Sequence, residues 1–467
     1  MSPQSPSPAW APDAHQAWLD SLALQAVVYA WPLYEMRRMW AATSPRKVES
    51  AGYAGDDPAS AMRWCNTFIH TRQLLKAGTS RVVMPNNDTL YTNAWLDLSD
   101  GPLVIEVPAM DERYYVLGFL DFFTNPFAHV GTRTTGQAAG HILVTAPGWR
   151  GEVPPEFRAA GRQLQAPTPQ VWIIGRILVD GEDDIANVAP LQNRFRIRTL
   201  ADHLAGRDSP PRRFEADCDP RAKLGVEHFV TQVNRALADN PAPASDQALL
   251  ASFGKVGIGL DRQAASACIA RPEVAAALAN ALDSALGLLS EGRLRERHDA
   301  RTAHAGWRQS LAVAGESFGH DFLGRAFVAH QGIGALSPQE AIYPRCETDA
   351  AGDLLHGAHR YEIRFAPDAL PPVNAFWSIT LYGVEDNMLV ANPIDRYSIG
   401  DRTPGLRRDA DGGLTLTLQH AMPPSSEARA NWLPAPENGF FLCLRAYLPR
   451  AEMVDGRYRL PAPRRVD

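Results

Sequence analysis

Apolar residues recur every three or four positions in four stretches of the chain, which is the spacing that places them on one face of a helix. These stretches are residues 14–39, 58–75, 180–203 and 220–334. The first contains Pro32, which we expect to kink or end the helix. The last contains a stripe that is typical of a core-facing helix, made of Val274, Leu278, Leu282, Leu286 and Leu289.

Between the helical stretches the pattern changes to short apolar runs of strand type, separated by Pro and Gly. The first set of runs covers Leu103–Val107, Tyr114–Leu120, His141–Thr145 and Val171–Val179. The second set covers Arg360–Phe365, Ala375–Tyr382, Leu414–Leu418 and Phe440–Leu448. Short strands with turns between them predict a sandwich or jelly-roll, and not a parallel α/β sheet.

The two sets of runs follow the same order, and each closes with an apolar strand that contains one arginine, Arg176 or Arg445. This match indicates an internal duplication, while convergence on the ordinary pattern of strands is the alternative. An arginine in an apolar strand needs a carboxylate or carbonyl partner. We therefore predict two superposable β repeats, with these arginines at equivalent positions.

The predicted fold class is α+β with several domains: duplicated antiparallel β-sandwich or jelly-roll-like segments plus a mainly helical domain. A chain of 467 residues is long enough for such an arrangement. The expected parts are a disordered Pro/Ser-rich lead at 1–13, helices and a sandwich at 14–205, a helical region at 206–335 and a second sandwich at 336–467.

Composition and charge limit the classes of partner that the protein can bind. Hydrophobic residues at 45% and charged residues at 21% are ordinary for a soluble globular protein, and a net charge of -6 argues against nucleic-acid binding. No apolar run approaches the roughly 20 residues of a membrane span. The N-terminus lacks the pattern of a signal peptide, and the five scattered cysteines form no C-x-x-C pair. We expect a cytoplasmic protein without a membrane partner, and a homo-oligomer is compatible with these observations.

Two polar clusters are the candidates for chemistry. The first follows Pro85 and contains, with His70 upstream, Asn86, Asn87, Asp88, Thr89 and Tyr91. The second follows an aromatic strand that carries Trp377 and Tyr382, and it contains Asn392, Asp395, Arg396, Tyr397, Ser398 and Asp401. We predict that both clusters face one cleft, where they bind a small, partly apolar molecule that is anionic or carries a carbonyl group.

The clusters allow a catalytic and a structural interpretation. In the catalytic one, Asp88 or His70 acts as base and Arg396 or Tyr397 stabilises an oxyanion. Substrate binding then falls to Asn86, Asn87, Thr89, Tyr91, Trp377, Tyr382 and Asn392. In the structural one, the Asn and Asp side chains satisfy their own turn, His70 is a core histidine, and Arg396 pairs with Asp88 or Asp395 to tie two domains together.

Other motifs add little. Gly315–Gly319 matches G-x-S-x-G, but a nucleophile elbow needs a strand before the serine, and the surroundings here are helical. We expect Ser317 to have no histidine and acid pair within reach. Dinucleotide, P-loop and H-E-x-x-H motifs are absent, and His356 and His359 fit exposed turn residues better than ligands. We therefore expect no cofactor and no metal.

Several long motifs cover nearly the whole chain. They are Asn66–Gln73, Pro85–Leu98, Val171–Gly181, Gly324–Leu336, Phe376–Gly383, Asn392–Arg402, Asn431–Pro436 and Phe441–Pro449. They resemble bacterial proteins built from two domains of unknown function, DUF1254 and DUF1214. The resemblance implies a β-sandwich part joined to a helical part, and it implies no particular activity. Many relatives look exported, whereas this chain shows no signal.

These observations predict a soluble enzyme that acts by hydrolysis or elimination on a small organic substrate in a polar and aromatic cleft. The alternative is a non-catalytic, jelly-roll-type module that binds carbohydrate or lipid, with Trp377, Trp432 and tyrosines as stacking surfaces. An enzyme should bury Asp88 and Arg396 in a cleft, whereas a binding module should leave its aromatic residues on an open face.

Overall fold

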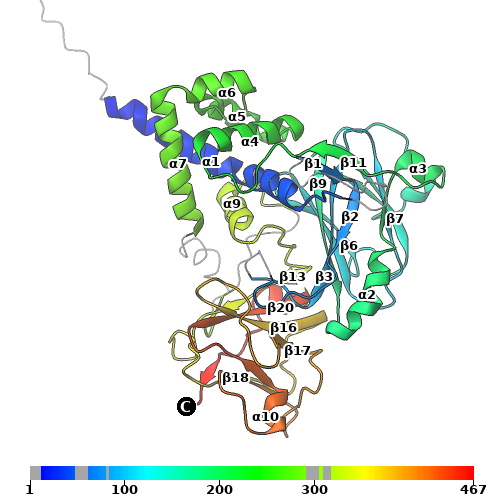
Figure 1. Cartoon of the computed structure of the whole chain (residues 1–467), viewed down its shortest axis with the longest axis vertical. Coiled ribbons are helices and arrows are strands. Elements are labelled where there is room, and N and C mark those ends of the chain that lie inside the picture. The colour runs from blue at the N-terminus through cyan, green and yellow to red at the C-terminus, as the bar shows by residue number, and fades with distance from the viewer. Residues whose placement is uncertain (1–11, 48–60, 80–83, 291–303, 309–316) are drawn as a thin grey trace, which may run out of the picture.

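The computed structural model of the chain describes residues 12–47, 61–79, 84–290, 304–308 and 317–467. Figure 1 shows a group of helices beside one β-rich part, with a second β-rich part below. The predicted α+β class is confirmed at this level. Among the described residues, none of the helices combines the length and the apolarity that a membrane crossing requires.

Helix α1 (Pro12–Thr43) is the centre of the helical part, and most of its residues are buried. The helices around it are α4 (Val226–Asp239), α5 (Gln247–Phe253), α6 (Arg262–Ile269), α7 (Pro272–Ser290) and α9 (Phe322–Gln331). Pro32 lies inside α1 without ending it, because packing against neighbours holds the helix together. The predicted apolar stripe of α7 faces this core, with only Leu286 less than fully buried.

Helix α1 also attaches the helical part to the first β-rich part. Near its end, Trp40 stacks on Trp95, and Trp95 stacks on Trp172, each with ring centroids 5.3 Å apart. Trp95 and Trp172 belong to adjacent strands of one sheet. The helices therefore cover the outer face of that sheet, and its inner face is left for a second core.

The first β-rich part is a sandwich of two sheets, called the N-terminal sandwich below. One sheet has the order β2-β3-β9-β5-β6, with β2 (Thr67–His70), β3 (Thr89–Asp97), β5 (Tyr115–Asp121), β6 (Pro126–Gly131) and β9 (Gln170–Leu178). The other has the order β10-β4-β7-β8, with β4 (Leu103–Val107), β7 (Gly140–Thr145), β8 (Gln163–Gln165) and β10 (Arg196–Thr199). A single core that includes Leu96, Ile105, Val144 and Ile173 joins their inner faces.

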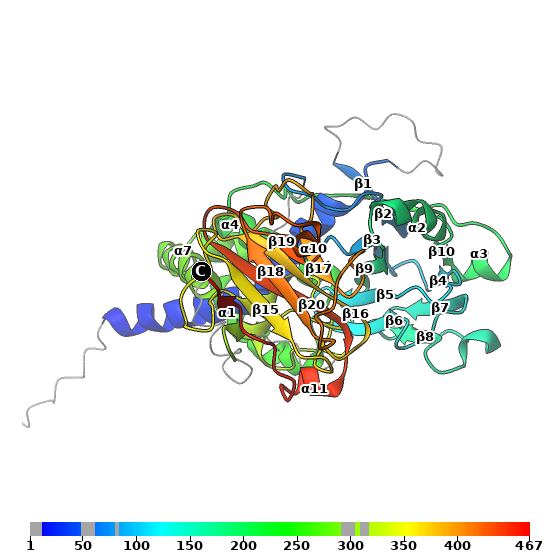
Figure 2. The ribbon, with the colours of Figure 1, turned by 90° about the horizontal axis from the view of Figure 1, so that it is seen from below.

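The second β-rich part is also a two-sheet sandwich, called the C-terminal sandwich, and Figure 2 views it from below. One sheet has the order β12-β14-β20-β16-β17, with β12 (Trp307–Arg308), β14 (Arg345–Cys346), β16 (Val373–Gly383), β17 (Ser398–Gly400) and β20 (Phe440–Pro449); β13 (Ala341–Ile342) also pairs with β20. The other has the order β19-β18-β15-β21, with β15 (Tyr361–Phe365), β18 (Leu414–Gln419), β19 (Trp432–Pro434) and β21 (Arg464–Arg465).

The two sandwiches repeat one strand arrangement. In chain order, β4 to β9 of the first correspond to β15 to β20 of the second, and they alternate between sheets in the same way. The sequence predicts antiparallel sheets, but each repeat also contains one parallel pair, β7 with β8 and β18 with β19. Arg176 in β9 lies opposite Val116 of β5, and Arg445 in β20 lies opposite Ser378 of β16. The strand order thus bears out the internal duplication.

One sequence-based assignment of helix is wrong, and a second is confirmed only in part. The described part of residues 58–75 contains β1 (Met62–Cys65) and β2, which pair with β11 (Arg212–Glu215) and β3. Within residues 180–203, a helical segment ends at Gln192 and is followed by strand β10. In both places strand pairing within a sheet outweighs a spacing of apolar residues that also fits a helix.

Candidate functional site

A cleft of about 460 Å³ lies where the two sandwiches meet. The N-terminal sandwich contributes the turn before β3 and the segment after β9, and the C-terminal sandwich contributes β17 with the loops on either side of it. The polar lining includes Lys76, Asn87, Asp88, Asp395, Tyr397 and Arg402. The turn at Pro85 and the loop at Asn392 thus contribute to one cleft, as the sequence predicts.

The turn before β3 is built by Asn86. Its Oδ1 accepts a hydrogen bond from the backbone N–H of Asp88 at 2.7 Å, and its Nδ2 donates to Thr89 Oγ1 at 3.0 Å and to the Tyr447 hydroxyl at 2.6 Å. The Tyr382 hydroxyl donates to the Pro85 carbonyl at 2.8 Å. Asn86 and Thr89 therefore shape the turn, as the structural interpretation holds, and Tyr447 and Tyr382 anchor it to the C-terminal sandwich.

This anchored turn places Asp88 at the base of the cleft, where its side chain is only 6% exposed. Asp88 Oδ2 accepts a hydrogen bond from Ser378 Oγ at 2.6 Å, and Oδ1 accepts one from Arg402 Nη2 at 3.1 Å. Arg402 Nη1 also contacts Asp180 Oδ1 at 3.0 Å, and its guanidinium lies over the Phe376 ring at 4.2 Å. The cation that meets Asp88 is therefore Arg402.

The sequence-based expectation that Arg396 pairs with Asp88 is wrong. Its Nη1 donates to three backbone carbonyls, those of Arg429, Ala430 and Trp432, at 2.9, 3.1 and 2.9 Å. Burial lowers the pKa of Arg396. Because carbonyl groups already surround this guanidinium nitrogen, Arg396 stabilises the loop that forms the wall of the cleft.

Other charges of the cleft form pairs of their own. The Tyr397 hydroxyl donates to Asp395 Oδ1 at 3.0 Å. Burial, followed by the hydrogen bond to Asp395, raises the pKa of Tyr397. Lys76 Nζ lies 2.6 Å from Glu182 Oε1 and 4.0 Å from Asp395 Oδ2. These pairs place cations and carboxylates from both sandwiches around the mouth of the cavity.

Three predicted site residues lie away from the cleft. His70 contacts Thr92 Oγ1 through Nδ1 at 3.2 Å, and burial, followed by nearby arginines, lowers its pKa to about 4. Tyr91 lies below the guanidinium of Arg176, 5.5 Å from it. Asn392 bonds to the backbone of its own loop, including Arg396 N at 3.0 Å. None of the three lines the cavity, so the structure does not support a base role for His70.

The predicted aromatic wall is also absent. Trp377 is 2% exposed within the core of the C-terminal sandwich, and Tyr382 is fully buried with its hydroxyl on Pro85. Trp432 is fully buried and donates to the Gln419 carbonyl at 2.8 Å. Trp377 therefore packs between the sheets of the C-terminal sandwich, whereas Tyr382 lies on the other face of β16 and anchors the turn at Pro85.

Asp401 and Arg402 are the residues that the site prediction underrated. Asp401 accepts a hydrogen bond from the backbone N–H of Trp377 at 3.3 Å, and it lies 3.8 Å from Arg402 Nε. Burial raises the pKa of Asp401 to about 6. Both residues end the polar motif that begins at Asn392, so the sequence did carry a signal for them.

Between the sandwiches lies a second buried group of cations. Arg176 Nη2 donates to the Gly334 carbonyl at 3.2 Å, and Arg445 donates to Thr380 Oγ1 at 3.1 Å and to the Met84 carbonyl at 2.9 Å. Both arginines thus have the carbonyl partners that their position in apolar strands requires. Arg445 holds the start of the turn that carries Asp88.

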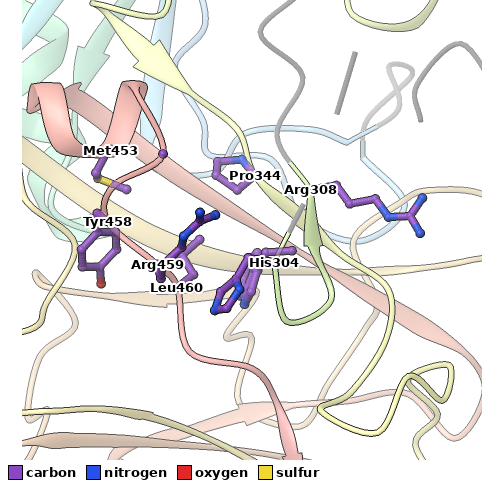
Figure 3. A pocket seen from close by; sticks show the side chains of 9 residues that line it. His304, Arg308, Pro344, Met453, Tyr458, Arg459 and Leu460 are labelled. Carbon is purple, nitrogen blue, oxygen red and sulfur yellow. The ribbon is translucent and has the colours of Figure 1, made fainter. Parts of the chain in front are cut away.

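Two other hollows lack comparable chemistry. The pocket in Figure 3, beside His304 and Tyr458, has about 30 Å³, which is room for about one water molecule. A more open hollow of about 600 Å³ borders helix α11 (Ala451–Val454), and its one arginine, Arg133, already pairs with Glu340 at 2.7 Å. The cleft at Asp88 is therefore the candidate site.

The G-x-S-x-G motif lies partly outside the described residues, which resume at Ser317. Ser317 Oγ accepts a hydrogen bond from the backbone N–H of Gly319 at 3.2 Å. Within the described chain, no histidine donates to or accepts from this oxygen. Helix α9 begins later, at Phe322, and residues 309–316, where a strand before the serine would lie, are outside the described part of the chain.

Two repeated sandwiches that meet at a polar cleft, with helices over one of them, define the class of protein. The model of the family described as protein of unknown function DUF1254 matches residues 65–199, in the N-terminal sandwich. The model for DUF1214, also a protein of unknown function, matches residues 340–451, in the C-terminal sandwich. The chain therefore belongs to the proteins that join these two domains.

Similar structures are known. The VPA0106 protein from Vibrio parahaemolyticus is 26% identical, with a TM-score of 0.67 over 96% of this chain and 100% of its own. An uncharacterized protein from Burkholderia cenocepacia is 13% identical, with a TM-score of 0.39 over 97% of this chain and 95% of its own. No curated protein matches the chain. The first similarity extends over both sandwiches and the helices.

Proposed function

We propose that the protein is an enzyme that binds a small polar organic molecule between the sandwiches and acts on it by hydrolysis or elimination. The observation that carries the proposal is the contact between Asp88 and Arg402, which come from opposite sandwiches and meet in the cleft. Its volume of about 460 Å³ falls within the range of small-molecule sites.

Unsatisfied polar atoms indicate the kind of ligand. Among the described residues, Arg402 Nε and Asn87 Oδ1 are buried without a hydrogen-bond partner, and both residues line the cleft. Leaving such an atom unpaired costs roughly 1–3 kcal/mol. A molecule that carries both a carbonyl oxygen and a hydroxyl or amide N–H would satisfy the donor and the acceptor together. This supports a carbonyl-bearing substrate.

The roles that we propose differ in part from the sequence-based ones. In hydrolysis, Asp88 takes a proton from water while the water oxygen attacks the carbonyl carbon, and Arg402 stabilises the oxyanion. In elimination, Asp88 takes a proton from the carbon beside the carbonyl, and Arg402 stabilises the enolate. Asp88, once protonated, gives this proton to the leaving group in either reaction.

The alternative of a non-catalytic, jelly-roll-type binding module has less support. Such a module needs aromatic side chains on an open face to stack against a sugar or lipid. Trp377 and Trp432 are 2% and 0% exposed. We therefore favour a catalytic function over that of a binding module.

A substrate panel with matched variants tests the proposal. Esters, lactones and amides report hydrolysis, and hydroxy acids report elimination through the absorbance of the conjugated product. We expect Asp88→Asn to lower kcat/KM by at least about 100-fold, because it removes the base. The free energy of unfolding should fall by no more than about 1–2 kcal/mol, since the amide keeps an acceptor for Ser378.

The control is Glu427→Gln, which breaks an exposed pair with Arg407 (3.2 Å) outside the cleft and should leave turnover unchanged. A folded Asp88→Asn variant with full turnover would contradict the proposal. A variant that unfolds, in a protein that no member of the panel stabilises, would show that Asp88 is a structural tie.

A further inference from the structure

We propose that His141, Glu156 and His203, on the outer face of the N-terminal sandwich, bind a divalent transition-metal ion of the zinc type. They come from three elements: strand β7, the 3-10 turn Pro155–Phe157 and helix α3 (Leu200–Leu204). Their metal-binding atoms all lie within 4.8 Å of one another. None of them lines the cleft at Asp88, so this is a separate site.

The spacing of the ligand atoms fits a tetrahedral ion. Bonds of 2.0–2.1 Å at tetrahedral angles place neighbouring ligand atoms about 3.3 Å apart. His203 Nε2 lies 3.4 Å from Glu156 Oε1. The rings of His141 and His203 are 4.7 Å apart between centroids and nearly perpendicular, at 80°. Because His141 and Glu156 are exposed, small side-chain rotations suffice to complete the set.

The second nitrogen of His203 has the partner that metal-bound histidines usually have. His203 Nδ1 lies 3.3 Å from Glu106 Oε1, and Arg198 Nη1 holds the same oxygen at 2.9 Å. A histidine that donates its Nδ1 proton to a carboxylate turns the Nε2 lone pair outward, ready for a metal. In this arrangement the Nε2 lone pair faces the carboxylate of Glu156, and the two electron-rich atoms repel each other. A cation bound between Nε2 and the carboxylate oxygen would attract both.

Packing holds His203 in this orientation. Its side chain is 9% exposed and lies against the Phe157 ring, with centroids 5.6 Å apart. Phe157 belongs to a small apolar cluster with Val104 and Leu143 on the outer face of the sheet. Figure 2 shows β4, β7, β10 and α3 together at one side of the molecule. The site therefore rests on a sheet, which limits the movement of its most buried ligand.

The internal repeat shows that the fold itself does not require these side chains. Glu106 and His141 face each other as the fourth residue pair of the β4–β7 ladder. The fourth pair of the corresponding β15–β18 ladder is Arg364 and Thr415, and both bond to Asp409, at 3.0 and 2.8 Å. An ordinary network of charges thus fills the place in the C-terminal sandwich, and only the N-terminal one presents histidines.

The ligand types define the ion. Imidazole nitrogens suit zinc and its neighbours among the transition metals, whereas calcium and magnesium prefer oxygen ligands. Two histidines and one carboxylate leave a coordination position for water. The sequence offered no signal for the site, because its three ligands are far apart and form no spacing motif.

Zinc titration of the metal-free full-length protein by calorimetry tests the proposal. We expect one Zn²⁺ per chain, and at least about tenfold weaker binding in His141→Ala and Glu156→Gln. Both positions are exposed, so circular dichroism should show an intact fold. The control is His420→Ala, which removes a histidine 3.5 Å from the carboxylate of Glu437 in the other sandwich and should leave zinc binding unchanged.

Cobalt(II) as a probe separates this site from cysteine. Binding at His141, His203 and Glu156 gives weak d–d bands without the intense near-ultraviolet bands of a thiolate complex. Undiminished zinc binding in both variants, cysteine-type bands, or calcium bound as tightly as zinc would each overturn the proposal. A titration without saturable zinc binding would do so as well.

Discussion

At the scale of the residue, the cleft depends on which of two arginines meets Asp88. Arg396 and Arg402 belong to one motif and flank the short strand β17. Pairing of β17 with β16 places Gly400 opposite Ser378, which brings Arg402 to Asp88 and leaves Arg396 among backbone carbonyls. The sequence identifies the cluster but not the partner, because the choice depends on the register of two strands.

Asp401 makes stability depend on pH. Burial raises its pKa to about 6, above the 3.8 of an exposed aspartate, so the folded state holds this proton more tightly than the unfolded state. The resulting stabilisation is complete below pH 3.8 and is lost as the pH rises through 6. At pH 7, Asp401→Asn should therefore raise the free energy of unfolding relative to wild type, by no more than about 1 kcal/mol, because solvent screens this partly exposed carboxylate.

Urea denaturation at pH 4 and pH 7 measures this difference, which should nearly vanish at pH 4. The control is Asp386→Asn, an exposed position that also accepts a backbone N–H, from Met388 at 2.9 Å. A gain from Asp401→Asn that is equal at both pH values would mean that the buried charge is not its cause.

At the scale of the element, the sequence predicts strands better than helices. The runs of β4, β5, β7 and β9 and their counterparts in the second repeat lie where alternation and turns predict them. The error at residues 62–70 has a physical cause: β1 and β2 pair with strands that are distant in sequence, β11 and β3. A helix over 58–75 would carry His70 toward the turn at Pro85, but His70 ends strand β2 and contacts Thr92 instead.

A glycine in β9 tests how tightly the central sheet is built. A Cβ at Gly175 would lie 2.3 Å from the Thr92 carbonyl oxygen and 2.6 Å from Leu117 Cδ2. Since one of these atoms is backbone, Gly175→Ala should lower the free energy of unfolding by about 1–3 kcal/mol. Chemical denaturation measures the change.

The matched substitution is Gly287→Ala in α7, where a Cβ would meet no atom within 4 Å. It should raise the free energy of unfolding by about 0.5–1 kcal/mol, because alanine favours the helix. If Gly175→Ala leaves the free energy of unfolding unchanged or raises it, as Gly287→Ala should, then β3 and β9 can move apart to admit the methyl group.

At the scale of the whole molecule, the two sandwiches are joined through the same residues that form the site. Tyr114 and Val116 of the first share an apolar cluster with Phe376 and Tyr447 of the second. The polar turn with Asp88 adds hydrogen bonds to the C-terminal sandwich beside this cluster. The sequence predicts the two domains but does not show that this turn lies in their interface. The polar residues of the turn fit a binding site equally well, so the pattern alone does not distinguish the two roles.

The interface predicts that both sandwiches unfold together. Tyr447→Phe removes the 2.6 Å hydrogen bond from Asn86 across it and should lower the free energy of unfolding by about 1–2 kcal/mol. Tyr458→Phe is the matched change within one sandwich, where the hydroxyl donates to the Ala369 carbonyl at 2.8 Å. If the halves are coupled, each variant shifts one common transition.

Hydrogen exchange measured by mass spectrometry along a urea series follows β3 and β20 separately in each variant. Coincident transitions are expected because separating the halves would expose the apolar cluster and leave Asn86, Asp88 and Arg445 without partners that they now contact. Suppose instead that Tyr458→Phe shifts β20 while β3 unfolds at the wild-type urea concentration. The sandwiches would then be independent, and the cleft would open and close with their relative motion.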